Sequence, residues 1–301
     1  MVEENDNFRS GFAALVGRTN VGKSTLLNRL IGRKVTIMSE KVQTTRNRIL
    51  GVLTREECQV IFLDTPGIHK PKHKLGEHLV QVALNTLNEV DLVLFLVEAN
   101  RQPGPGDNYL IRQFADLSTP VALVINKIDL VKRKELLPLI ERYARLYKFS
   151  EIIPVSALSG ENTGRLLEVT TSYLPAGPKY YPDEMVTDRP EEFILAELIR
   201  EKVLSHTEQE VPHAVAVVIE EMQERPNNVM AVRAVIYTER ETQKGILIGK
   251  GGQMLKKIGS LARADMEKLL GLKVFLQIRV KTRPDWRNKE AQLKNLGYYE
   301  T

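Results

Sequence analysis

Short, continuously apolar segments recur through the first half of the chain and alternate with segments of helical periodicity. Five of them predict buried strands, at residues 11–17, 59–64, 92–98, 121–126 and 152–156. Strands with helices on both faces have such uninterrupted apolar runs, because both sides of the strand are buried. Helical patterns lie between them, at residues 23–30, 76–88, 106–117, 134–147 and 163–173. This order predicts an α/β unit with a mostly parallel sheet and helices on both sides.

The pattern changes after residue 173. The stretch at 174–190 (LPAGPKYYPDEMVTDRP) contains four prolines and little periodicity, which is typical of a linker. Beyond it the sequence predicts helices at 192–206, 253–270 and 285–296, the last opened by Pro284, and strands at 213–221, 230–239 and 273–281. This order is α+β. We therefore predict a first domain at residues 1–176, a linker at 177–190 and a second domain at 191–301.

The composition limits the class of protein. A chain of 301 residues with 43% hydrophobic and 27% charged residues has the size and balance of a globular protein with two domains. No apolar run approaches the roughly 20 residues that span a bilayer, and the acidic start lacks the order of a signal peptide. The single cysteine, Cys58, excludes an internal disulfide framework. We expect a cytoplasmic protein.

The charges are unevenly distributed along the chain. The total is +5, but residues 180–224 have a net charge of −9 and residues 225–301 a net charge of +9. A localised basic surface is expected of a protein that binds phosphate backbones. A solvated face with ion pairs accounts for the charges equally well.

A phosphate-binding loop is predicted between the first strand and the first helix. The segment GRTNVGKS matches the pattern G-x-x-x-x-G-K-[ST]. Its glycines let backbone N–H groups close around phosphate oxygens, and the helix N-terminus adds a positive dipole. We expect Lys23 to bridge the β- and γ-phosphates and the Ser24 hydroxyl to bind Mg²⁺. The predicted contacts with the nucleotide are Gly17, Arg18, Thr19, Asn20, Val21, Gly22, Lys23, Ser24 and Thr25.

A second motif identifies the base. Asn126, Lys127, Ile128 and Asp129 follow a predicted strand, and a carboxylate such as Asp129 can accept hydrogen bonds from N1–H and the 2-amino group of guanine. Adenine offers neither donor, so it would leave the carboxylate unpaired. Lys127 can cover the base and Asn126 can hold the loop against the phosphate loop. Ser156, Ala157 and Leu158 follow the next strand, where a backbone N–H can meet guanine O6.

A third motif, Asp64-Thr65-Pro66-Gly67, ends the second predicted strand. Asp64 is expected to hold Mg²⁺, and Gly67 gives a backbone N–H room to reach the γ-phosphate. A threonine upstream, either Thr44 or Thr45, should complete the Mg²⁺ shell when the γ-phosphate is present; we favour Thr45. Segments 37–49 and 68–74 are polar and basic, as movable switch loops are. We expect catalysis to depend on Lys23, Thr45, Asp64 and Gly67.

These motifs together resemble the translation-factor-like branch of small GTPases. Asn20, the QTTR segment and the DTPGIHKPK segment resemble the Era family, and the resemblance covers the whole chain. Many GTPases place a glutamine after the third motif to orient the attacking water, but this chain has Ile68 there. We therefore expect slow intrinsic hydrolysis of GTP to GDP. The resemblance further implies that Asn20 helps to hold a K⁺ ion beside the phosphates.

The basic C-terminal part contains a G-x-x-G loop at Gly249, Lys250, Gly251 and Gly252. In KH domains such a loop clamps the backbone of a few unpaired nucleotides. The predicted order of elements is that of a type-2 KH domain. Lysines cluster around the loop and could neutralise phosphates. The predicted RNA contacts are Lys244, Ile248, Gly249, Lys250, Gly251, Gly252, Lys256 and Lys257; a helix N-terminus with incidental glycines and lysines is the simpler alternative.

The Era resemblance implies a partner for this loop. Members of that family join a GTPase to a type-2 KH domain that binds single-stranded RNA near the 3′ end of small-subunit ribosomal RNA. We therefore expect a monomeric GTPase that assists small ribosomal subunit assembly and acts as a nucleotide-timed switch. The alternative is a membrane-associated cell-cycle or signalling GTPase whose KH unit is structural. Family members associate peripherally with the inner membrane, and the Lys256–Lys257 region could contact anionic lipid.

Overall fold

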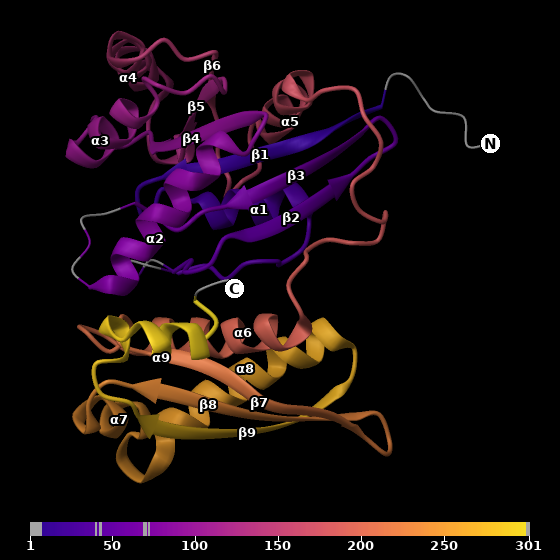
Figure 1. The fold of residues 1–301 in the computed structure, drawn as a ribbon, viewed down its shortest axis with the longest axis vertical. Helices are drawn as coiled ribbons and strands as arrows, with labels where there is room; N and C mark the ends of the chain where they lie inside the picture. The colour runs from indigo at the N-terminus through magenta and orange to yellow at the C-terminus, as the bar shows by residue number, and fades with distance from the viewer. Residues whose placement is uncertain (1–7, 40, 42–43, 69–70, 72, 299–301) are drawn as a thin grey trace. The chain divides into compact units, whose positions relative to one another are not determined.

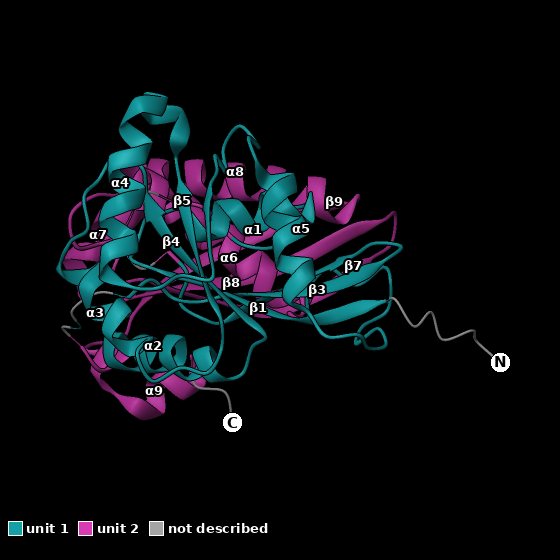
Figure 2. Cartoon of the chain, turned by 90° about the horizontal axis from the view of Figure 1, so that it is seen from above, with its two compact units in different colours: residues 1–36, 45–71, 76–188 teal, residues 37–44, 72–75, 189–301 magenta. Residues whose placement is uncertain are grey.

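The computed structural model describes residues 8–39, 41, 44–68, 71 and 73–298. The chain forms two compact units, and each is described by itself (Figure 2). Unit 1 comprises residues 1–36, 45–71 and 76–188, and unit 2 comprises residues 37–44, 72–75 and 189–301. Six residues of the predicted switch loops lie outside the described residues: Glu40, Val42, Gln43, His69, Lys70 and Lys72.

Unit 1 is built on a six-stranded sheet with the order β2-β3-β1-β4-β5-β6. The strands are β1 (Arg9–Gly17), β2 (Ile49–Thr54), β3 (Cys58–Asp64), β4 (Leu92–Glu98), β5 (Val121–Asn126) and β6 (Glu151–Pro154). β2 pairs with β3 in the antiparallel direction, and the other pairs are parallel. The five predicted strands are confirmed. The sequence did not predict β2, which follows the first predicted switch loop.

Helices cover both faces of this sheet (Figure 1). They are α1 (Lys23–Ile31), α2 (Lys74–Asn85), α3 (Pro105–Gln113), α4 (Arg133–Leu146) and α5 (Thr163–Tyr173). Leu94 and Phe95 are neighbours on β4, yet Leu94 packs in the core with residues of α1 and α5, whereas Phe95 packs in the core with residues of α2, α3 and α4. Successive side chains of a strand point to opposite faces, which explains why the strands are apolar at every position.

The proline-rich stretch after α5 contains bends and turns and is hydrogen-bonded to the sheet of unit 1. The Gln59 side chain is fully buried, and its amide accepts from the backbone N–H groups of Tyr180 at 2.7 Å and Tyr181 at 2.9 Å. The backbone N–H of Val52 donates to the carbonyl of Val186 at 3.0 Å. These bonds satisfy a buried polar group and fix the stretch along β2 and β3.

Unit 2 contains a three-stranded sheet with the order β7-β8-β9. Its elements are α6 (Glu191–His206), β7 (Ala216–Arg225), β8 (Val229–Thr238), α7 (Glu241–Ile248), α8 (Gln253–Leu270), β9 (Lys273–Thr282) and α9 (Glu290–Asn295). A three-residue turn, Pro226, Asn227 and Asn228, joins antiparallel β7 and β8, and both asparagines in it have positive φ. β8 and β9 are parallel, so the chain crosses between them through α7 and α8.

The C-terminal part differs from its prediction. A single helix at 285–296 was expected, but a 3-10 turn, Trp286–Asn288, precedes the shorter α9. Asp285 has a left-handed φ of 56° and Lys289 is extended, so no continuous α-helix runs through these two positions. Trp286 is fully buried and donates its indole N–H to the carbonyl of Ala214 at 3.0 Å. Within the described residues, no helix is long and apolar enough to cross a membrane.

Candidate functional site

Four adjacent parallel strands of unit 1 end in residues that lie at one edge of the sheet. These are Gly17 of β1, Asp64 of β3, Glu98 of β4 and Asn126 of β5. Three of them begin or end a motif predicted from the sequence. Ligands of open α/β sheets bind at this carboxyl edge, where neighbouring loops diverge from the strand ends. The fold therefore brings the three motifs together.

The phosphate loop wraps around the amino group of Lys23. This side chain is buried and donates to the carbonyl groups of Gly17 at 3.2 Å and Arg18 at 2.9 Å. Gly22 has a φ of 99°, a backbone conformation that residues with a side chain rarely adopt. Helix α1 begins directly after it. Burial lowers the pKa of Lys23 to about 8, against the opposing effect of Asp64. An anion in the loop would restore the preference of this amine for its charged form.

Three oxygen-bearing side chains converge beside this loop. The Ser24 hydroxyl donates to Oδ2 of Asp64 at 2.7 Å, the Thr45 hydroxyl donates to the same oxygen at 3.2 Å, and the two hydroxyl oxygens are 2.9 Å apart. Thr45 and Asp64 are buried. The neighbouring Thr44 instead donates its hydroxyl to the carbonyls of Lys41 and Ser39. The structure thus places Thr45, and not Thr44, in this cluster.

The cluster has the composition of a magnesium site. Asp64 is fully buried, and its second oxygen, Oδ1, has no hydrogen-bond partner within the described residues. Burial raises the pKa of Asp64, although Lys23, Ser24 and Thr45 oppose the change. A buried carboxylate oxygen without a partner is costly, and a cation would remove that cost. One carboxylate and two hydroxyl groups are the hard oxygen ligands that Mg²⁺ prefers.

The third motif approaches the phosphate loop closely. A Cβ atom at Gly67 would lie 2.8 Å from Cα of Thr19, so only glycine fits at this position. The backbone N–H of Ile68 donates to the carbonyl of Gly17 at 3.2 Å. The side chain of Ile68 is buried in the apolar core. Thr65 and Pro66 are buried as well, and the Thr65 hydroxyl donates to the carbonyl of Leu15 at 2.8 Å.

Asn126 joins two loops through its side-chain amide. The amide nitrogen donates to the carbonyl of Val21 at 2.8 Å, and the amide oxygen accepts from the backbone N–H of Ala157 at 2.9 Å. A Cβ atom at Gly22 would collide with this amide. The phosphate loop, the NKID segment and the segment after β6 are therefore held together by one buried side chain, as expected for Asn126 from the sequence.

The remaining base-site residues lie around Asn126. Lys127 has a left-handed φ of 65°, and its amino group donates to the carbonyl of Asn20 at 2.8 Å. The Ser156 hydroxyl donates to Asp129 at 2.5 Å, which fixes one oxygen of this exposed carboxylate. Ile128 is partly buried, and Leu158 is exposed. The Ser156 hydroxyl thus links the Asp129 carboxylate, which follows β5, to the segment that follows β6.

Two acidic residues at this edge were missed by the sequence reasoning. Glu98 forms ion pairs with Lys127 at 2.5 Å, Arg101 at 3.3 Å and Arg18 at 3.9 Å. Asp107, in the first turn of α3, forms an ion pair with Arg18 at 2.9 Å. The backbone of Arg18 lies in the phosphate loop, and its side chain is held by these two carboxylates. Glu98 is the last residue of an apolar strand, a signal that could have identified it.

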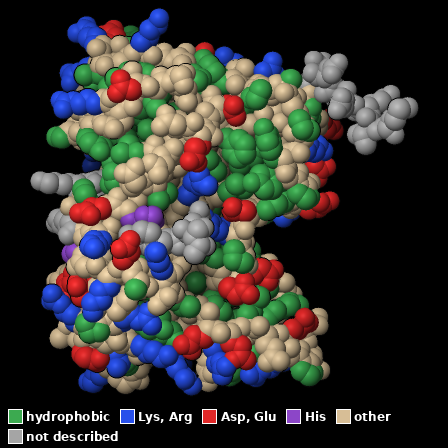
Figure 3. All heavy atoms as spheres, in the orientation of Figure 1, with side chains coloured by type: hydrophobic (Ala, Val, Ile, Leu, Met, Phe, Trp, Pro, Cys, Tyr) green, Lys and Arg blue, Asp and Glu red, His purple; other side chains and the backbone are tan. Residues whose placement is uncertain are grey.

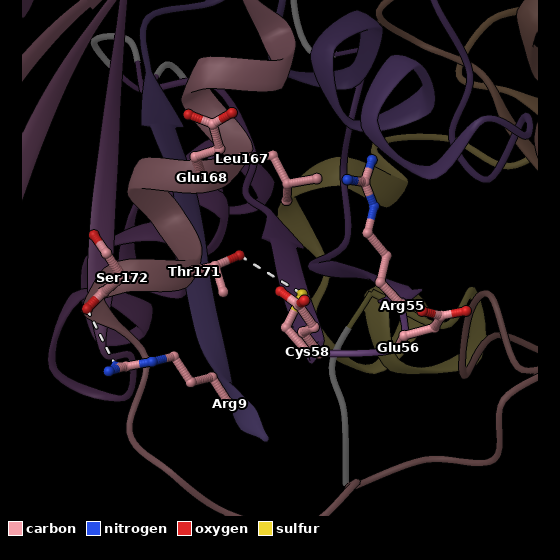
Figure 4. Close-up of a pocket in the computed structure, with 9 residues that line it drawn as sticks. Arg9, Arg55, Glu56, Cys58, Leu167, Glu168, Thr171 and Ser172 are labelled. Carbon is pink, nitrogen blue, oxygen red and sulfur yellow. Dashed lines mark hydrogen bonds between the residues drawn. The ribbon is translucent and has the colours of Figure 1, made fainter. Parts of the chain in front are cut away.

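A separate cavity of about 770 Å³ lies at the amino ends of β1 and β3, which begin at Arg9 and Cys58 (Figure 4). The guanidinium of Arg9 donates to the carbonyl of Ser172 at 3.4 Å. The Thr171 hydroxyl lies 3.7 Å from the buried thiol of Cys58. Arg55, Glu56, Glu57, Leu167 and Glu168 complete the lining. None of the predicted nucleotide contacts borders it.

In unit 2, the G-x-x-G loop lies between α7 and α8. Gly249, Gly251 and Gly252 all have positive φ, at 71°, 58° and 78°. A Cβ atom at Gly249 would also lie 2.8 Å from Cβ of Met254. The loop therefore depends on glycine for its backbone shape, and it leads directly into the N-terminus of α8. Lys250 and Gly251 are exposed at its tip.

Lysines surround this loop as predicted from the sequence. Lys250, Lys256 and Lys257 are exposed, and within the described residues they form no ion pairs. Lys244 is partly buried and pairs with Glu241 at 3.4 Å on the same helix. Figure 3 shows Lys and Arg side chains spread over the part that holds α7 to β9 in Figure 1, with acidic side chains between them. Ile248 ends α7 and is partly buried.

Comparison with protein-family models gives two matches. Residues 12–127 match the family described as 50S ribosome-binding GTPase, and residues 210–287 match the family described as KH domain. The first match contains the phosphate loop and the DTPG motif, and it ends at Lys127, within the NKID motif. The second contains the G-x-x-G loop and the three-stranded sheet.

Comparison with solved structures gives two close neighbours over nearly the whole chain. One is a point variant of Era from Aquifex aeolicus bound to GDP and AlF4⁻, with 42% identity and a TM-score of 0.94. The other is Era in complex with MgGDPNP and nucleotides 1506–1542 of 16S ribosomal RNA, with 42% identity and a TM-score of 0.95. Each comparison covers 97% of this chain and 100% of the other.

Proposed function

Because the chain belongs to the Era family of GTPases, we propose that it binds GTP with Mg²⁺ and hydrolyses it to GDP. We propose further that its KH domain binds small-subunit ribosomal RNA and that the protein assists maturation of the small ribosomal subunit. The observation that carries the nucleotide proposal is the convergence of Ser24, Thr45 and Asp64 beside a loop that encloses Lys23.

In this proposal Ser24, Thr45 and Asp64 hold Mg²⁺, and Lys23 binds the β- and γ-phosphates. The metal neutralises charge on the phosphates and helps to position them. The backbone of residues 17–25 cradles the phosphates, with N–H groups at the start of α1 directed toward them. Gly67 lets its own N–H approach the γ-phosphate, since no side chain separates it from Thr19.

Hydrolysis requires a water molecule in line with the γ-phosphate. Ile68 is apolar and its side chain is buried, so it cannot orient that water. Backbone groups, ions or a partner must do so, and we expect slow hydrolysis by the isolated protein. Asn20, with a left-handed φ of 66°, is the residue that we propose helps to hold a K⁺ ion beside the phosphates.

The choice of guanine is assigned to Asp129. Its carboxylate is fixed by Ser156 and lies in the exposed loop after β5, where it can accept hydrogen bonds from N1–H and the 2-amino group. Lys127 covers the base. Ala157 and Leu158 contribute backbone near guanine O6, and Asn126 keeps both loops in place.

The RNA site is assigned to the G-x-x-G loop and its lysines. Glycine at positions 249, 251 and 252 lets a single strand approach the N-terminus of α8, and the exposed amino groups of Lys250, Lys256 and Lys257 can neutralise phosphates. Era bound to nucleotides 1506–1542 of 16S ribosomal RNA supports a region near the 3′ end as the partner. We also propose that the protein is cytoplasmic and contacts the membrane peripherally.

The functional domains are proposed at residues 1–176 and 191–301, joined by 177–190. GTP would order the loops that contain Thr45 and Gly67, and hydrolysis would release them. The protein would then act as a timer for its contact with ribosomal RNA.

The test measures RNA binding and GTP hydrolysis with the full chain. We expect Kd for a short single-stranded RNA copied from the 3′ end of 16S ribosomal RNA to rise strongly in Gly251→Asp, while GTP hydrolysis stays unchanged. Equal RNA binding by wild type and variant would contradict the RNA proposal. Preferential binding of wild type to anionic vesicles over this RNA would favour a membrane-associated GTPase instead. Absence of hydrolysis with Mg²⁺ and GTP would contradict the enzymatic proposal.

A further inference from the structure

The carboxylate of Glu98 occupies a central place at the carboxyl edge of the sheet. β4 lies between β1, which leads into the phosphate loop, and β5, which leads into NKID. Glu98 is directly opposite Asn126 in the register of β4 and β5. Its side chain is buried, with one oxygen 2.5 Å from the amino group of Lys127 and the other 3.9 Å from the guanidinium of Arg18. The Glu98 carboxylate therefore lies next to Arg18 of the phosphate loop and Lys127 of NKID.

Arg18 is fixed from its other side by Asp107. The Arg18 Nε donates to Oδ1 of Asp107 at 2.9 Å, and Oδ2 of this buried carboxylate accepts the backbone N–H of Gly104 at 2.8 Å. A Cβ atom at Gly106 would lie 2.8 Å from Cδ of Arg18, so glycine leaves room for the arginine. The phosphate loop is thus tied to the first turn of α3 as well as to β4.

We infer that Glu98 is a positioning residue of the guanine-nucleotide site. It holds the amino group of Lys127 against the carbonyl of Asn20, 2.8 Å away, so that the lysine stem is already placed to cover the base. The inference rests on the proposed nucleotide site. A long, flexible lysine loses rotamer freedom when a ligand orders it, and fixing it beforehand reduces that loss on binding. Glu98 acts through Lys127 and touches no part of the nucleotide.

The direction in which nucleotide affinity changes when Glu98 is neutralised distinguishes positioning of Lys127 from electrostatic repulsion of the phosphates. Glu98 is an acid close to the place of a triphosphate, so charge alone predicts tighter nucleotide binding when it is neutralised. Positioning predicts weaker binding. The base is the same in GTP and GDP, so both should lose affinity by the same factor. An interaction that is equal in ground state and transition state changes KM and leaves kcat unchanged.

The experiment compares wild type with Glu98→Gln in the full chain. We expect Kd for GTP and for GDP to rise by about tenfold each, with kcat at saturating GTP unchanged. Arg101→Ala, which removes an exposed partner of the same carboxylate, is the matched control and should change Kd by less than twofold. An unchanged or lower Kd in Glu98→Gln would overturn the inference, as would unequal changes for GTP and GDP.

A double-mutant cycle tests whether Glu98 acts through Lys127. We expect the double variant Glu98→Gln/Lys127→Gln to bind no more weakly than Lys127→Gln alone, because the partner of the carboxylate is already absent. If the double variant instead raises Kd by the product of the two single-variant factors, the inference is contradicted. If Glu98→Gln does not fold in a thermal unfolding assay, Glu98→Asp keeps the charge with a shorter reach, and it should raise both Kd values. No nucleotide binding by wild type would instead contradict the proposed function itself.

Discussion

The hydroxyl oxygens of Ser24 and Thr45 lie 2.9 Å apart, although 21 residues separate them in the chain. Both hydroxyl groups donate to the same oxygen of Asp64. The neighbouring Thr44 donates to carbonyl groups of its own segment. The two adjacent threonines therefore provide a matched pair of variants.

Thr45→Ala should reduce GTP hydrolysis much more than Thr44→Ala. In the proposed site Thr45 supplies a metal ligand when the γ-phosphate is present, and we expect kcat/KM to fall by about 100-fold in Thr45→Ala. Thr44→Ala removes a hydroxyl that is bonded elsewhere and should stay within about threefold of wild type. Steady-state hydrolysis over a range of Mg²⁺ concentrations measures both. A larger loss in Thr44→Ala would assign the switch threonine to the other position.

Removal of the metal should lower the stability that the nucleotide provides. A ligand that binds only the folded state at 100 times its Kd stabilises it by about 2.7 kcal/mol. We expect thermal unfolding with GDP and Mg²⁺ to occur at a higher temperature than with GDP and a chelator, because Asp64 Oδ1 is buried and has no hydrogen-bond partner among the described residues. The same comparison with Asp64→Asn should show a much smaller difference. Equal shifts in wild type and variant would place the metal elsewhere.

The strand-end residues of the site could be predicted because their positions follow from periodicity. Continuous apolar runs located the strands, and parallel strands bring their carboxyl ends to one edge. Asp64 and Asn126 were found in this way. Glu98 satisfies the same rule, but it lies in none of the three motifs. The pairing of Arg18 with Asp107 joins residues 89 positions apart, which one-dimensional spacing cannot indicate.

Other elements depend on tertiary contacts, which hydrophobic periodicity along the sequence does not reveal. β2 contains Gly51, and a side chain there would meet Leu27 and Ile31 of α1, so its place in the sheet is set by packing. The predicted last helix was interrupted where Asp285 adopts a left-handed conformation and Trp286 becomes buried. The choice between Thr44 and Thr45 was open for a similar reason, because only the fold decides which of two adjacent hydroxyl groups faces Asp64.

Asp129→Asn should change the base that the site accepts. The carboxylate accepts from the N1–H and 2-amino groups of guanine, whereas an amide can donate one hydrogen bond to the 2-carbonyl of xanthine. We expect GTP affinity to fall by about 100-fold or more and affinity for xanthosine triphosphate to rise. Competition of both nucleotides against labelled GDP measures the change. Ser156→Ala, which removes the hydroxyl that donates to Asp129 at 2.5 Å, should weaken GTP binding without this gain for xanthine.

The proposed K⁺ site predicts a dependence on the monovalent cation. GTP hydrolysis should be faster in KCl than in NaCl at equal ionic strength, because a K⁺ ion held beside the phosphates would add positive charge where negative charge develops in the transition state. Asn20→Ala should reduce the rate in KCl to the rate in NaCl while leaving the rate in NaCl unchanged. Initial rates in the two salts measure the ratio. A ratio of one in wild type would remove K⁺ from the proposal.

The exposed lysines of α8 predict a defined change in salt dependence. Each phosphate contact with single-stranded RNA contributes a slope of about 0.7 to the fall of log K with log salt. Lys256→Ala/Lys257→Ala should therefore reduce this slope by about 1.4 and weaken binding at low salt. Arg133→Ala/Lys134→Ala, a pair of exposed cations on α4, is the matched control and should leave the slope unchanged. Equal slopes for the two double variants would show that α8 makes no phosphate contacts and that another surface holds the RNA.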